Sequence, residues 1–412
     1  MTNREDCVAR DAADPIARSR NAFILPEGVI YLDGNSLGPV TKASAARVQK
    51  VVHEEWGQGL IRSWNDADWI NSGTRIGDRI AKLIGANDDE VVVGDSTSVN
   101  VFKQVATAVK LRPGRKVIVS EAGNFPTDLY MVQGLIDLLD DDYELRLVPE
   151  GANVKEAIGE DTAAVLITHV DFKVGQQYDM ADLTKAAHDK GAIMIWDLCH
   201  SAGAVPVDLN GANVDLAVGC TYKYLNGGPG APAFCFVAKR LQADARQPLY
   251  GWMGHAKPFD FDTNFVPAPG ITRHLSGSHV ILALSSLDSA LDVWDDVTMD
   301  QVRAKSLDLT DLFMDLVESR CANMGFETIT PRDRIVRGSQ VSLLHKNAFP
   351  IMQALISKGV IGDYREPDIL RFGFTPLYTS FADVWDAVEI LSDIMAKGIW
   401  KEDRFNVRGA VT

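Results

Sequence analysis

Short runs of apolar residues recur through the middle of the chain, separated by stretches with helical periodicity or by turn residues. The runs lie at 90–94, 117–120, 143–148, 164–168, 192–197, 214–219 and 233–237. Apolar runs of this length, bounded by turn residues, are typical of strands buried on both faces. Strands that alternate with helices form a mainly parallel sheet with helices on both faces, so the pattern predicts an α/β fold.

The pattern changes after about residue 285, where longer stretches carry apolar residues at helical spacing. They predict two amphipathic helices, at 302–317 and 384–395, with strand-like segments at 335–344 and 369–374 between them. This combination is typical of a smaller C-terminal α+β domain. We therefore divide the chain into an N-terminal arm at 1–50, a large domain at 51–285 and a small domain at 286–412.

Ahead of the large domain, residues 29–32 predict a strand that runs into a turn at 33–39. Two glycines and Asn35 in this turn suit positive φ or a close approach of the backbone to a ligand, and a plain turn is the alternative. A helix is expected from near Thr41. Its apolar stripe contains Ala45, Val48, Val52 and Trp56.

Composition and charge restrict the class of partner. The chain has 412 residues and a formal net charge of −15, which argues against nucleic acid because phosphate backbones require a basic face. No apolar run approaches membrane-spanning length, and the N-terminus lacks the apolar core of a signal peptide. The five cysteines are scattered without metal-ligand spacing. We therefore expect a cytoplasmic protein without a metal site.

The most informative stretch is Thr221–Gly230, which places Lys223 between two apolar runs, beside tyrosines and glycines. A lysine there is costly to bury unless it is paired or modified, and a loop lysine in water is the alternative. Upstream, Asp197 ends another apolar run. Such a lysine and aspartate serve pyridoxal phosphate (PLP) enzymes, where the lysine forms a Schiff base and the aspartate keeps the pyridine nitrogen protonated.

Two further segments suit a phosphorylated flat ring. Thr97 and Ser98 open a helix after a strand, where free N–H groups and hydroxyls bind phosphate, although a Ser/Thr N-cap is an equally simple explanation. In the segment 125–128, Phe125 is fixed by Pro126 and suits stacking on a heterocycle. The alternative is a helix start capped by Thr127 or Asp128. His200 also follows the strand that ends at Asp197, where a structural histidine is the commoner case.

Beyond the last apolar run of the large domain, Trp252 and Ser278 lie in segments rich in aromatic and hydroxyl groups. They suit a phosphate site completed by a second subunit, and a surface loop is the alternative. Arg371 lies inside an apolar strand of the small domain. Its guanidinium needs a carboxylate partner, either within the protein or on a ligand.

Taken together, these motifs resemble the kynureninase family, fold-type-I PLP hydrolases related to class V aminotransferases. The resemblance covers nearly the whole chain, and the GNSLGP, FPTD and TYKYLNGGPG blocks are its most specific parts. The matching segments are Tyr31–Pro39, Phe125–Asp128, Trp196–Gly203, Thr221–Gly230, Gly251–His255 and Leu370–Phe374. The resemblance implies the PLP-dependent transferase fold of type I.

The resemblance also implies roles for single residues. Lys223 would hold the cofactor and remove the α-proton, Asp197 would pair with the pyridine nitrogen, and Tyr222 would donate a proton later. Phe125 would stack on the ring beside His200. The other cofactor contacts would be Thr97, Ser98, Pro126, Thr127, Asp128, Thr168, Tyr222, Trp252 and Ser278.

A homodimer is implied, because Trp252 and Ser278 would reach the cofactor of the neighbouring subunit. Arg371 would bind the substrate carboxylate, with Trp64, Gly277 and Asn35 also on the substrate side. Ser278 replaces a threonine that is frequent in related bacterial enzymes, and both side chains carry a hydroxyl.

The reaction implied is cleavage of L-kynurenine to anthranilate and L-alanine in tryptophan catabolism, with 3-hydroxy-L-kynurenine cleaved less well. An aminotransferase or a cysteine desulfurase of the same fold is the first alternative. A protein of this fold that has lost catalysis and serves as a scaffold is the second. The chain retains Lys223, Asp197 and Arg371, and it has no cysteine in the setting that a desulfurase needs.

Overall fold

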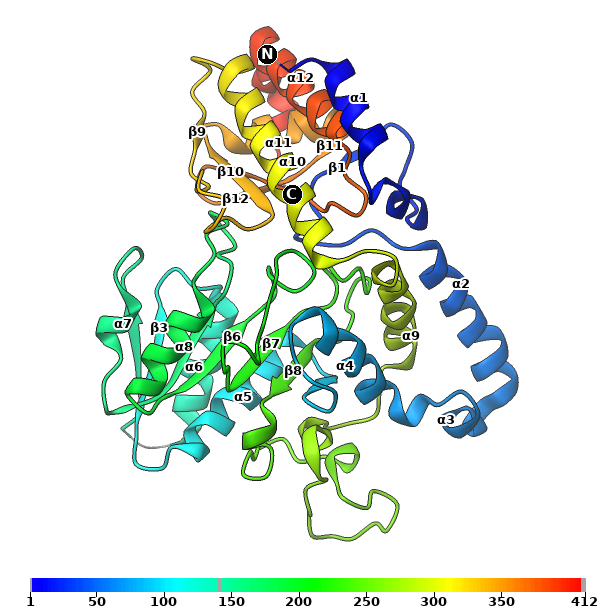
Figure 1. Ribbon diagram of the computed structural model, residues 1–412, viewed down its shortest axis with the longest axis vertical. Coiled ribbons are helices and arrows are strands. Elements are labelled where there is room, and N and C mark those ends of the chain that lie inside the picture. The colour runs from blue at the N-terminus through cyan, green and yellow to red at the C-terminus, as the bar shows by residue number, and fades with distance from the viewer. Residues whose placement is uncertain (1, 140–141, 409–412) are drawn as a thin grey trace.

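The computed structural model describes residues 2–139 and 142–408. A large unit with a wide sheet forms the lower part of the molecule in Figure 1, and a smaller unit with a second sheet lies above it. The second unit is formed mainly by the C-terminal third of the chain, together with α1 (Arg4–Ala13).

In the described part of the chain, the large sheet has seven strands in the order β2-β8-β7-β6-β5-β3-β4. Within it, β8 runs antiparallel to β2 and β7, and the remaining neighbours are parallel. The strands are β2 (Val91–Val93), β3 (Val117–Glu121), β4 (Glu144–Val148), β5 (Thr162–Thr168), β6 (Ile193–Asp197), β7 (Leu216–Gly219) and β8 (Phe234–Val237). Each predicted apolar run overlaps one strand, so the mainly parallel sheet is confirmed.

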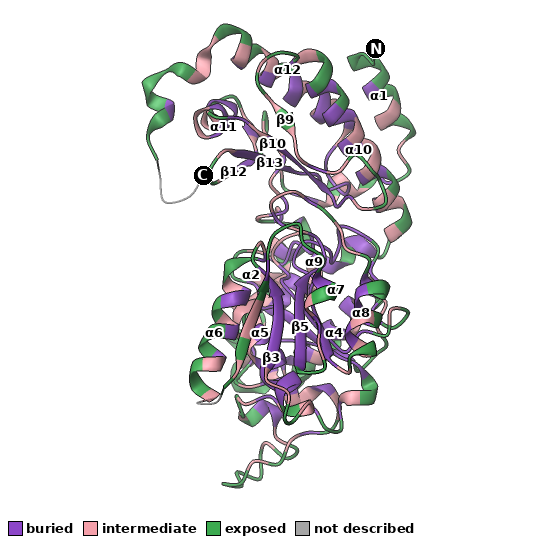
Figure 2. Cartoon of the chain, turned by 90° about the vertical axis from the view of Figure 1, so that its left-hand side faces the viewer, coloured by how far each residue is buried: buried purple, intermediate pink, exposed green. Residues whose placement is uncertain are grey.

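Both faces of this sheet are buried, which explains why its strands are continuous apolar runs. In β2, Val91 and Val93 pack into one hydrophobic core and Val92 into another, because successive side chains point to opposite faces. Figure 2 shows β3 and β5 buried between helices on either side. The helices of the large unit are α2 (Lys42–Lys50), α3 (Ser63–Asp66), α4 (Ser72–Leu83), α5 (Thr97–Leu111), α6 (Pro126–Leu139), α7 (Val154–Ala157), α8 (Met180–Asp189) and α9 (Ile281–Ala290).

The smaller unit has an antiparallel sheet in the order β12-β13-β10-β9, packed against helices. Its strands are β9 (Glu327–Thr328), β10 (Gln340–Leu344), β12 (Asp363–Arg365) and β13 (Ile369–Gly373), and its helices are α10 (Met299–Arg320), α11 (Ala348–Ser357) and α12 (Phe381–Lys397). Capping boxes begin α10 at Thr298 and α12 at Ser380, and Gly398 ends α12 with a φ of 67°. The predicted small α+β region is confirmed.

The N-terminal residues pack onto the small unit. Arg4 of α1 pairs with Asp386 of α12 at 2.7 Å, and β1 (Ile30–Tyr31) runs parallel to β11 (Val360–Ile361). Helix α9 crosses the predicted boundary at 285/286 and contributes Leu284 and Leu287 to the core of the large unit. The domain limits drawn from the sequence remain a prediction.

The helix predicted from Thr41 begins there, but its apolar stripe is wrong at the far end. Thr41 caps α2 by accepting a hydrogen bond from the Ser44 amide at 3.0 Å. From Val51 to Gly59 the helix widens into π-helical turns. Trp56, in this segment, is 59% exposed, whereas the rest of the stripe is half-buried.

Candidate active site

The loop after β7 is a tight turn that fixes Lys223. The Thr221 hydroxyl donates to the Pro232 carbonyl at 2.6 Å, and the Gly227 amide donates to the Thr221 carbonyl at 2.9 Å. From the other side, the Gly38 amide donates to the Tyr222 carbonyl at 2.8 Å. The backbone on both sides of Lys223 is therefore tied down.

A cavity of about 190 Å³ lies at the carboxyl ends of β5, β6 and β7, where ligands bind in parallel sheets. The N-termini of α5 and α6 complete its wall. It is lined by Thr97, Ser98, Phe125, Thr127, Asp128, Thr168, Phe172, Asp197, Cys199, His200, Tyr222 and Lys223. Ten of the predicted site residues therefore meet at one place, and Pro126 is the first residue of the adjoining helix α6.

Lys223 and His200 are in direct contact, with Nζ 3.0 Å from Nε2. Burial lowers the pKa of His200 well below its usual value, and the nearby positive charge of Lys223 lowers it further. A neutral imidazole can accept a hydrogen bond from the lysine. His200 therefore orients the Lys223 amine within the cavity.

Two buried carboxyl groups, Asp197 and Asp128, line the same cavity. Asp197 accepts hydrogen bonds from the Cys199 amide at 2.9 Å and from the Thr168 hydroxyl at 3.1 Å. Burial and the charge of Asp197 raise the pKa of Asp128 well above its usual value. One oxygen of Asp128 has no hydrogen-bond partner among the described residues. A cation in the cavity would relieve both groups.

The start of α5 separates the capping and binding roles that the sequence left open. Ser96 is the N-cap, since its hydroxyl accepts from the Val99 amide at 3.3 Å. Thr97 Oγ1 is buried and has no partner within the described chain. Thr97 and Ser98 therefore remain available at the positive end of the helix dipole, a site suited to an anion.

Trp64, Trp252, Gly277 and Ser278 lie beside the cavity rather than in it. The Trp252 indole N–H donates to Ser278 Oγ at 3.3 Å, and the rings of Trp64 and Trp252 are 6.3 Å apart at an edge-to-face angle. Gly277 and Ser278 line a second cavity of about 280 Å³, whose wall includes Thr97 and Tyr222. Thr97 and Tyr222 thus line both cavities.

Arg371 has a carboxylate partner inside the protein, one of the two possibilities that its sequence setting allowed. It is 1% exposed, and its Nε donates to Asp363 Oδ1 at 2.9 Å. Its other donors reach the Phe172 carbonyl at 2.7 Å and the Ser36 hydroxyl at 2.9 Å. Asn35 is fully buried beside this group.

Comparison with known proteins gives full-length relatives. The chain is 55% identical over its whole length to kynureninase of Burkholderia mallei and 53% identical to that of Pseudomonas fluorescens, each also covered completely. The family "Kynureninase C-terminal domain" matches residues 302–391. The chain belongs to the kynureninase family. The DegT/DnrJ/EryC1/StrS aminotransferase family matches residues 57–214.

Among solved structures, the apo cysteine desulfurase of Thermococcus onnurineus aligns with a TM-score of 0.77 at 17% identity. The alignment covers 92% of this chain and 98% of that one. At this identity the likeness concerns the fold alone, and it confirms the type I fold predicted from the sequence.

Kynureninases are PLP-dependent enzymes, and the cavity fits that cofactor. The unpartnered Thr97 hydroxyl and the start of α5 suit its phosphate. The paired carboxyl groups of Asp128 and Asp197 suit a protonated pyridine ring. Phe125, 39% exposed at the cavity wall, offers a face for stacking.

Several residues of the site escaped sequence reasoning. Asn124 joins the site through Thr168, whose hydroxyl lies 2.5 Å from Asn124 Oδ1. Phe172 packs edge-on against Phe125, with ring centroids 5.2 Å apart. Asp363 pairs with Arg371. Asn124 directly precedes the FPTD segment, which was a usable signal, whereas the pairing of Asp363 depends on contacts that no local pattern records.

The closeness of Gly38 to the Lys223 loop gives a testable prediction. A Cβ at Gly38 would lie 2.3 Å from the Lys223 carbonyl oxygen and 2.3 Å from Asn226 Oδ1. We expect Gly38→Ala to lower the free energy of unfolding by about 1–3 kcal/mol, measured by urea denaturation, and to reduce cofactor content. Gly134→Ala is the control, because its Cβ meets nothing within 4 Å in the middle of α6. An unchanged midpoint for Gly38→Ala would contradict the close contact.

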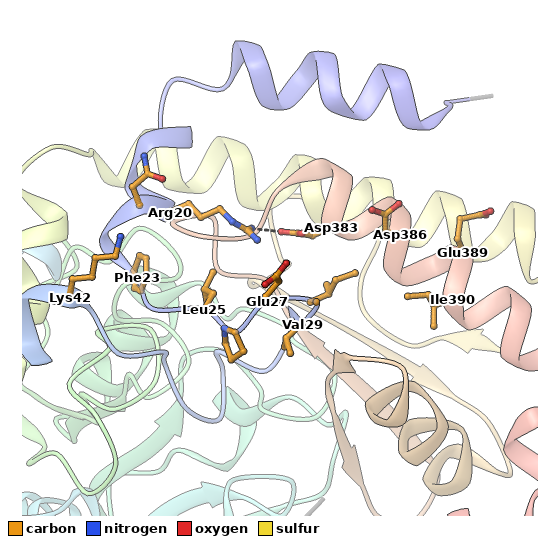
Figure 3. A pocket seen from close by; sticks show the side chains of 14 residues that line it. Arg20, Phe23, Leu25, Glu27, Val29, Lys42, Asp383, Asp386, Glu389 and Ile390 are labelled. Atoms are coloured by element: carbon orange, nitrogen blue, oxygen red, sulfur yellow. Dashed lines mark hydrogen bonds and ion pairs between the residues drawn. The ribbon is translucent and has the colours of Figure 1, made fainter.

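Another groove, of about 760 Å³, lies between residues 20–30 and α12 (Figure 3). Arg20 pairs with Asp383 across it, so the groove marks where the N-terminal segment docks. It contains none of the predicted site residues. Within the residues that the structure describes, no group of three His, Cys, Asp or Glu side chains is placed to hold a metal ion. No helix in the same residues has the length and apolarity to cross a membrane.

Proposed function

We propose that the protein hydrolyses L-kynurenine to anthranilate and L-alanine with PLP as cofactor. The observation that carries the proposal is the 55% identity to a kynureninase over the whole of both chains. The cavity around Lys223 supports it, because a lysine, two buried carboxyl groups and an anion site lie together there.

Lys223 would hold the cofactor covalently, and Asp197 would face its ring nitrogen. Thr97, Ser98 and the first turn of α5 would hold its phosphate, and Phe125 would stack on the ring. Bound in this way, the cofactor supplies an electron sink for charge that develops at the substrate Cα. Asp197 would keep that sink effective by favouring the protonated ring.

Lys223 would then move the proton at the substrate Cα, with His200 holding its amine in place at 3.0 Å. Tyr222 would be the acid of the later steps. Burial, and then the neighbouring Cys220 thiol, raise the pKa of Tyr222, which keeps its hydroxyl protonated at neutral pH. Water would add to the γ-carbonyl of the substrate, and the Cβ–Cγ bond would break with its electron pair left on the three-carbon fragment. Anthranilate would leave, and protonation of that fragment would give L-alanine.

Arg371 would bind the α-carboxylate of the substrate. Its guanidinium is held by Asp363, so substrate and Asp363 would share its N–H groups. Asn35, Trp64 and Gly277 would lie on the substrate side. We propose a preference for L-kynurenine over its 3-hydroxy form.

We further propose a homodimer in which Trp252 and Ser278 reach the cofactor of the neighbouring subunit. The proposal is supported by Trp252 lying outside the Lys223 cavity of its own chain, and by exposed apolar residues near it. Trp252 contacts the rings of Trp64 and Phe259. The segments that contain these two residues carry highly exposed apolar side chains, at Trp56, Leu60, Ile61, Phe259 and Phe261. Such exposure is typical of a surface that another subunit covers.

A mixing experiment tests this arrangement. Lys223→Ala and Trp252→Ala chains are each expected to be inactive or weakly active, while dimers that contain one of each have one intact site. Co-refolding equal amounts should therefore restore up to about a quarter of wild-type activity. No recovery, with mixed dimers present by mass spectrometry, would place Trp252 in the site of its own chain.

The state of the cysteines weighs against a desulfurase. All five are free and buried. Cys199 lines the cavity, but its hydrogen bond with Cys220, and then burial, raise its pKa well above the usual value, whereas a desulfurase needs a reactive thiolate. Buried thiols also suit a reducing compartment, and we propose that the protein acts in the cytoplasm. A transaminase would need a keto acid to complete its cycle.

The direct test is to incubate the holoenzyme with L-kynurenine and to measure fluorescent anthranilate and alanine in equal amounts. Adding a keto acid should leave the rate unchanged. Turnover that depends on the keto acid, or alanine formed from L-cysteine, would overturn the proposal in favour of a transaminase or a desulfurase.

A further inference from the structure

Asp33 lies close to Asp363 and Arg371, although it belongs to the N-terminal segment and they belong to the small unit. Residues 32–33 run beside the end of β13, where the Gly373 amide donates to the Leu32 carbonyl at 2.7 Å. Asp363 stands opposite Arg371 in the neighbouring strand β12. Strand pairing therefore brings two carboxyl groups to one guanidinium.

Asn35 and Ser36, which follow Asp33 in the turn, connect the two carboxyl groups with Arg371. With its amide nitrogen turned toward Asp33, Asn35 donates to Asp33 Oδ1 at 3.3 Å, and its oxygen lies 3.2 Å from Arg371 Nε, whose single N–H also reaches Asp363. The Ser36 hydroxyl accepts from Arg371 at 2.9 Å and donates to Asp363 at 2.9 Å. A change of charge on Asp33 is therefore transmitted to Arg371 through a short, buried path.

The charges of this cluster are nearly balanced. Arg365 also pairs with Asp363, at 2.6 Å, so two guanidiniums face the carboxylate of Asp363 and the carboxyl group of Asp33. With Asp33 protonated, one positive charge is left for an incoming carboxylate. With Asp33 ionised, the cluster is neutral and attracts a carboxylate less.

We propose that Asp33 is a positioning residue that acts through Arg371, and that its protonated form favours binding of the substrate α-carboxylate while its ionised form weakens it. This inference rests on the proposed role of Arg371 in kynurenine hydrolysis. It adds a carboxyl group that touches neither the cofactor cavity nor the reacting atoms.

The setting of Asp33 places its titration in a useful range. Burial, and then the charge of Asp363, raise the pKa of Asp33 to about 7, although Ser36, Arg371 and Arg365 act in the opposite direction. Binding that needs the protonated carboxyl is present below this pH and is lost as the pH rises through it. The titratable or charged groups around Asp33 are Tyr31, Tyr224, Asp363, Arg365, Arg371 and Tyr378.

The test measures KM and kcat for L-kynurenine against pH with the holoenzyme and with Asp33→Asn, which keeps hydrogen-bonding groups but cannot ionise. We expect the wild-type KM to rise about tenfold as the pH passes through neutrality, with little change in kcat from this cause. In Asp33→Asn that rise should be absent. The control Asp403→Asn, at an exposed position of the small unit, should follow the wild type.

A second measurement needs no variant. The amine that lacks the α-carboxylate of kynurenine should inhibit the wild type competitively with a Ki that has no such pH step, because it makes no contact with Arg371. The same step in the Ki of this amine, or an unchanged KM profile in a folded and active Asp33→Asn, would overturn the inference. Absence of turnover at every pH would instead contradict the proposed function itself.

Discussion

Replacing Lys223 by alanine should lower kcat for kynurenine cleavage by roughly 10⁴-fold, the largest effect that we expect from any single substitution. The amine at this position is proposed both to hold the cofactor and to move the Cα proton, and no other lysine lines the cavity of the described chain. His200 cannot replace it as a covalent anchor.

The measurement combines the rate of anthranilate formation with cofactor content from visible absorption. Lys397→Ala, at an exposed lysine at the end of α12 in the small unit, is the matched control and should keep wild-type activity. Borohydride reduction of the wild type should fix the cofactor to the peptide that contains Lys223. Labelling at another lysine, or substantial turnover by a loaded Lys223→Ala enzyme, would contradict the assignment.

Replacing Arg371 by lysine should raise KM for L-kynurenine by about 10–100-fold and lower kcat much less. Lysine keeps the positive charge but cannot form the planar, two-pronged contact that Arg371 makes with Asp363. Lysine is also preferable to alanine. Alanine would leave the buried Asp363 carboxylate paired only with the partly exposed Arg365, and this would destabilise the fold.

Arg365→Lys supplies the control, because Arg365 pairs with the same Asp363 oxygen but is about one-third exposed. We expect this variant to change KM less than threefold, in line with the small energies of partly exposed ion pairs. Equal effects of the two variants on KM, or a melting temperature that falls while KM stays constant, would mean that Arg371 is a structural residue.

The sequence by itself determined the parts of the protein that depend on local patterns. Continuous apolar runs identified the strands of the large sheet, since strands covered on both faces have no polar positions. The rule that ligands bind beyond the carboxyl ends of parallel strands favoured one site for Asp128, Thr168 and Asp197, which follow the ends of apolar runs or lie in the loops after them. Lys223 and Asp197 indicated the cofactor, and the family motifs added the type of reaction.

Local patterns were insufficient where the backbone conformation or a contact with a distant segment decides the outcome. Ser96, not Thr97, caps α5, and this depends on the conformation that the chain takes on leaving β2. The glycines at 34 and 38 have ordinary φ angles, and Gly38 is required by the approach of the Lys223 loop rather than of a ligand. Trp56 is exposed in a π-helical segment that the apolar pattern did not indicate.

For Arg371, the sequence and the tertiary structure each determined part of the outcome. An arginine in an apolar strand had to find a carboxylate, because an unpaired buried charge is strongly unfavourable, and the sequence was enough to say so. Only the tertiary structure decided that Asp363 is that partner and that Asp33 joins it. Antiparallel pairing of β12 with β13 and the passage of residues 32–33 beside Gly373 fix those contacts, and both join segments whose sequences contain no mark of each other.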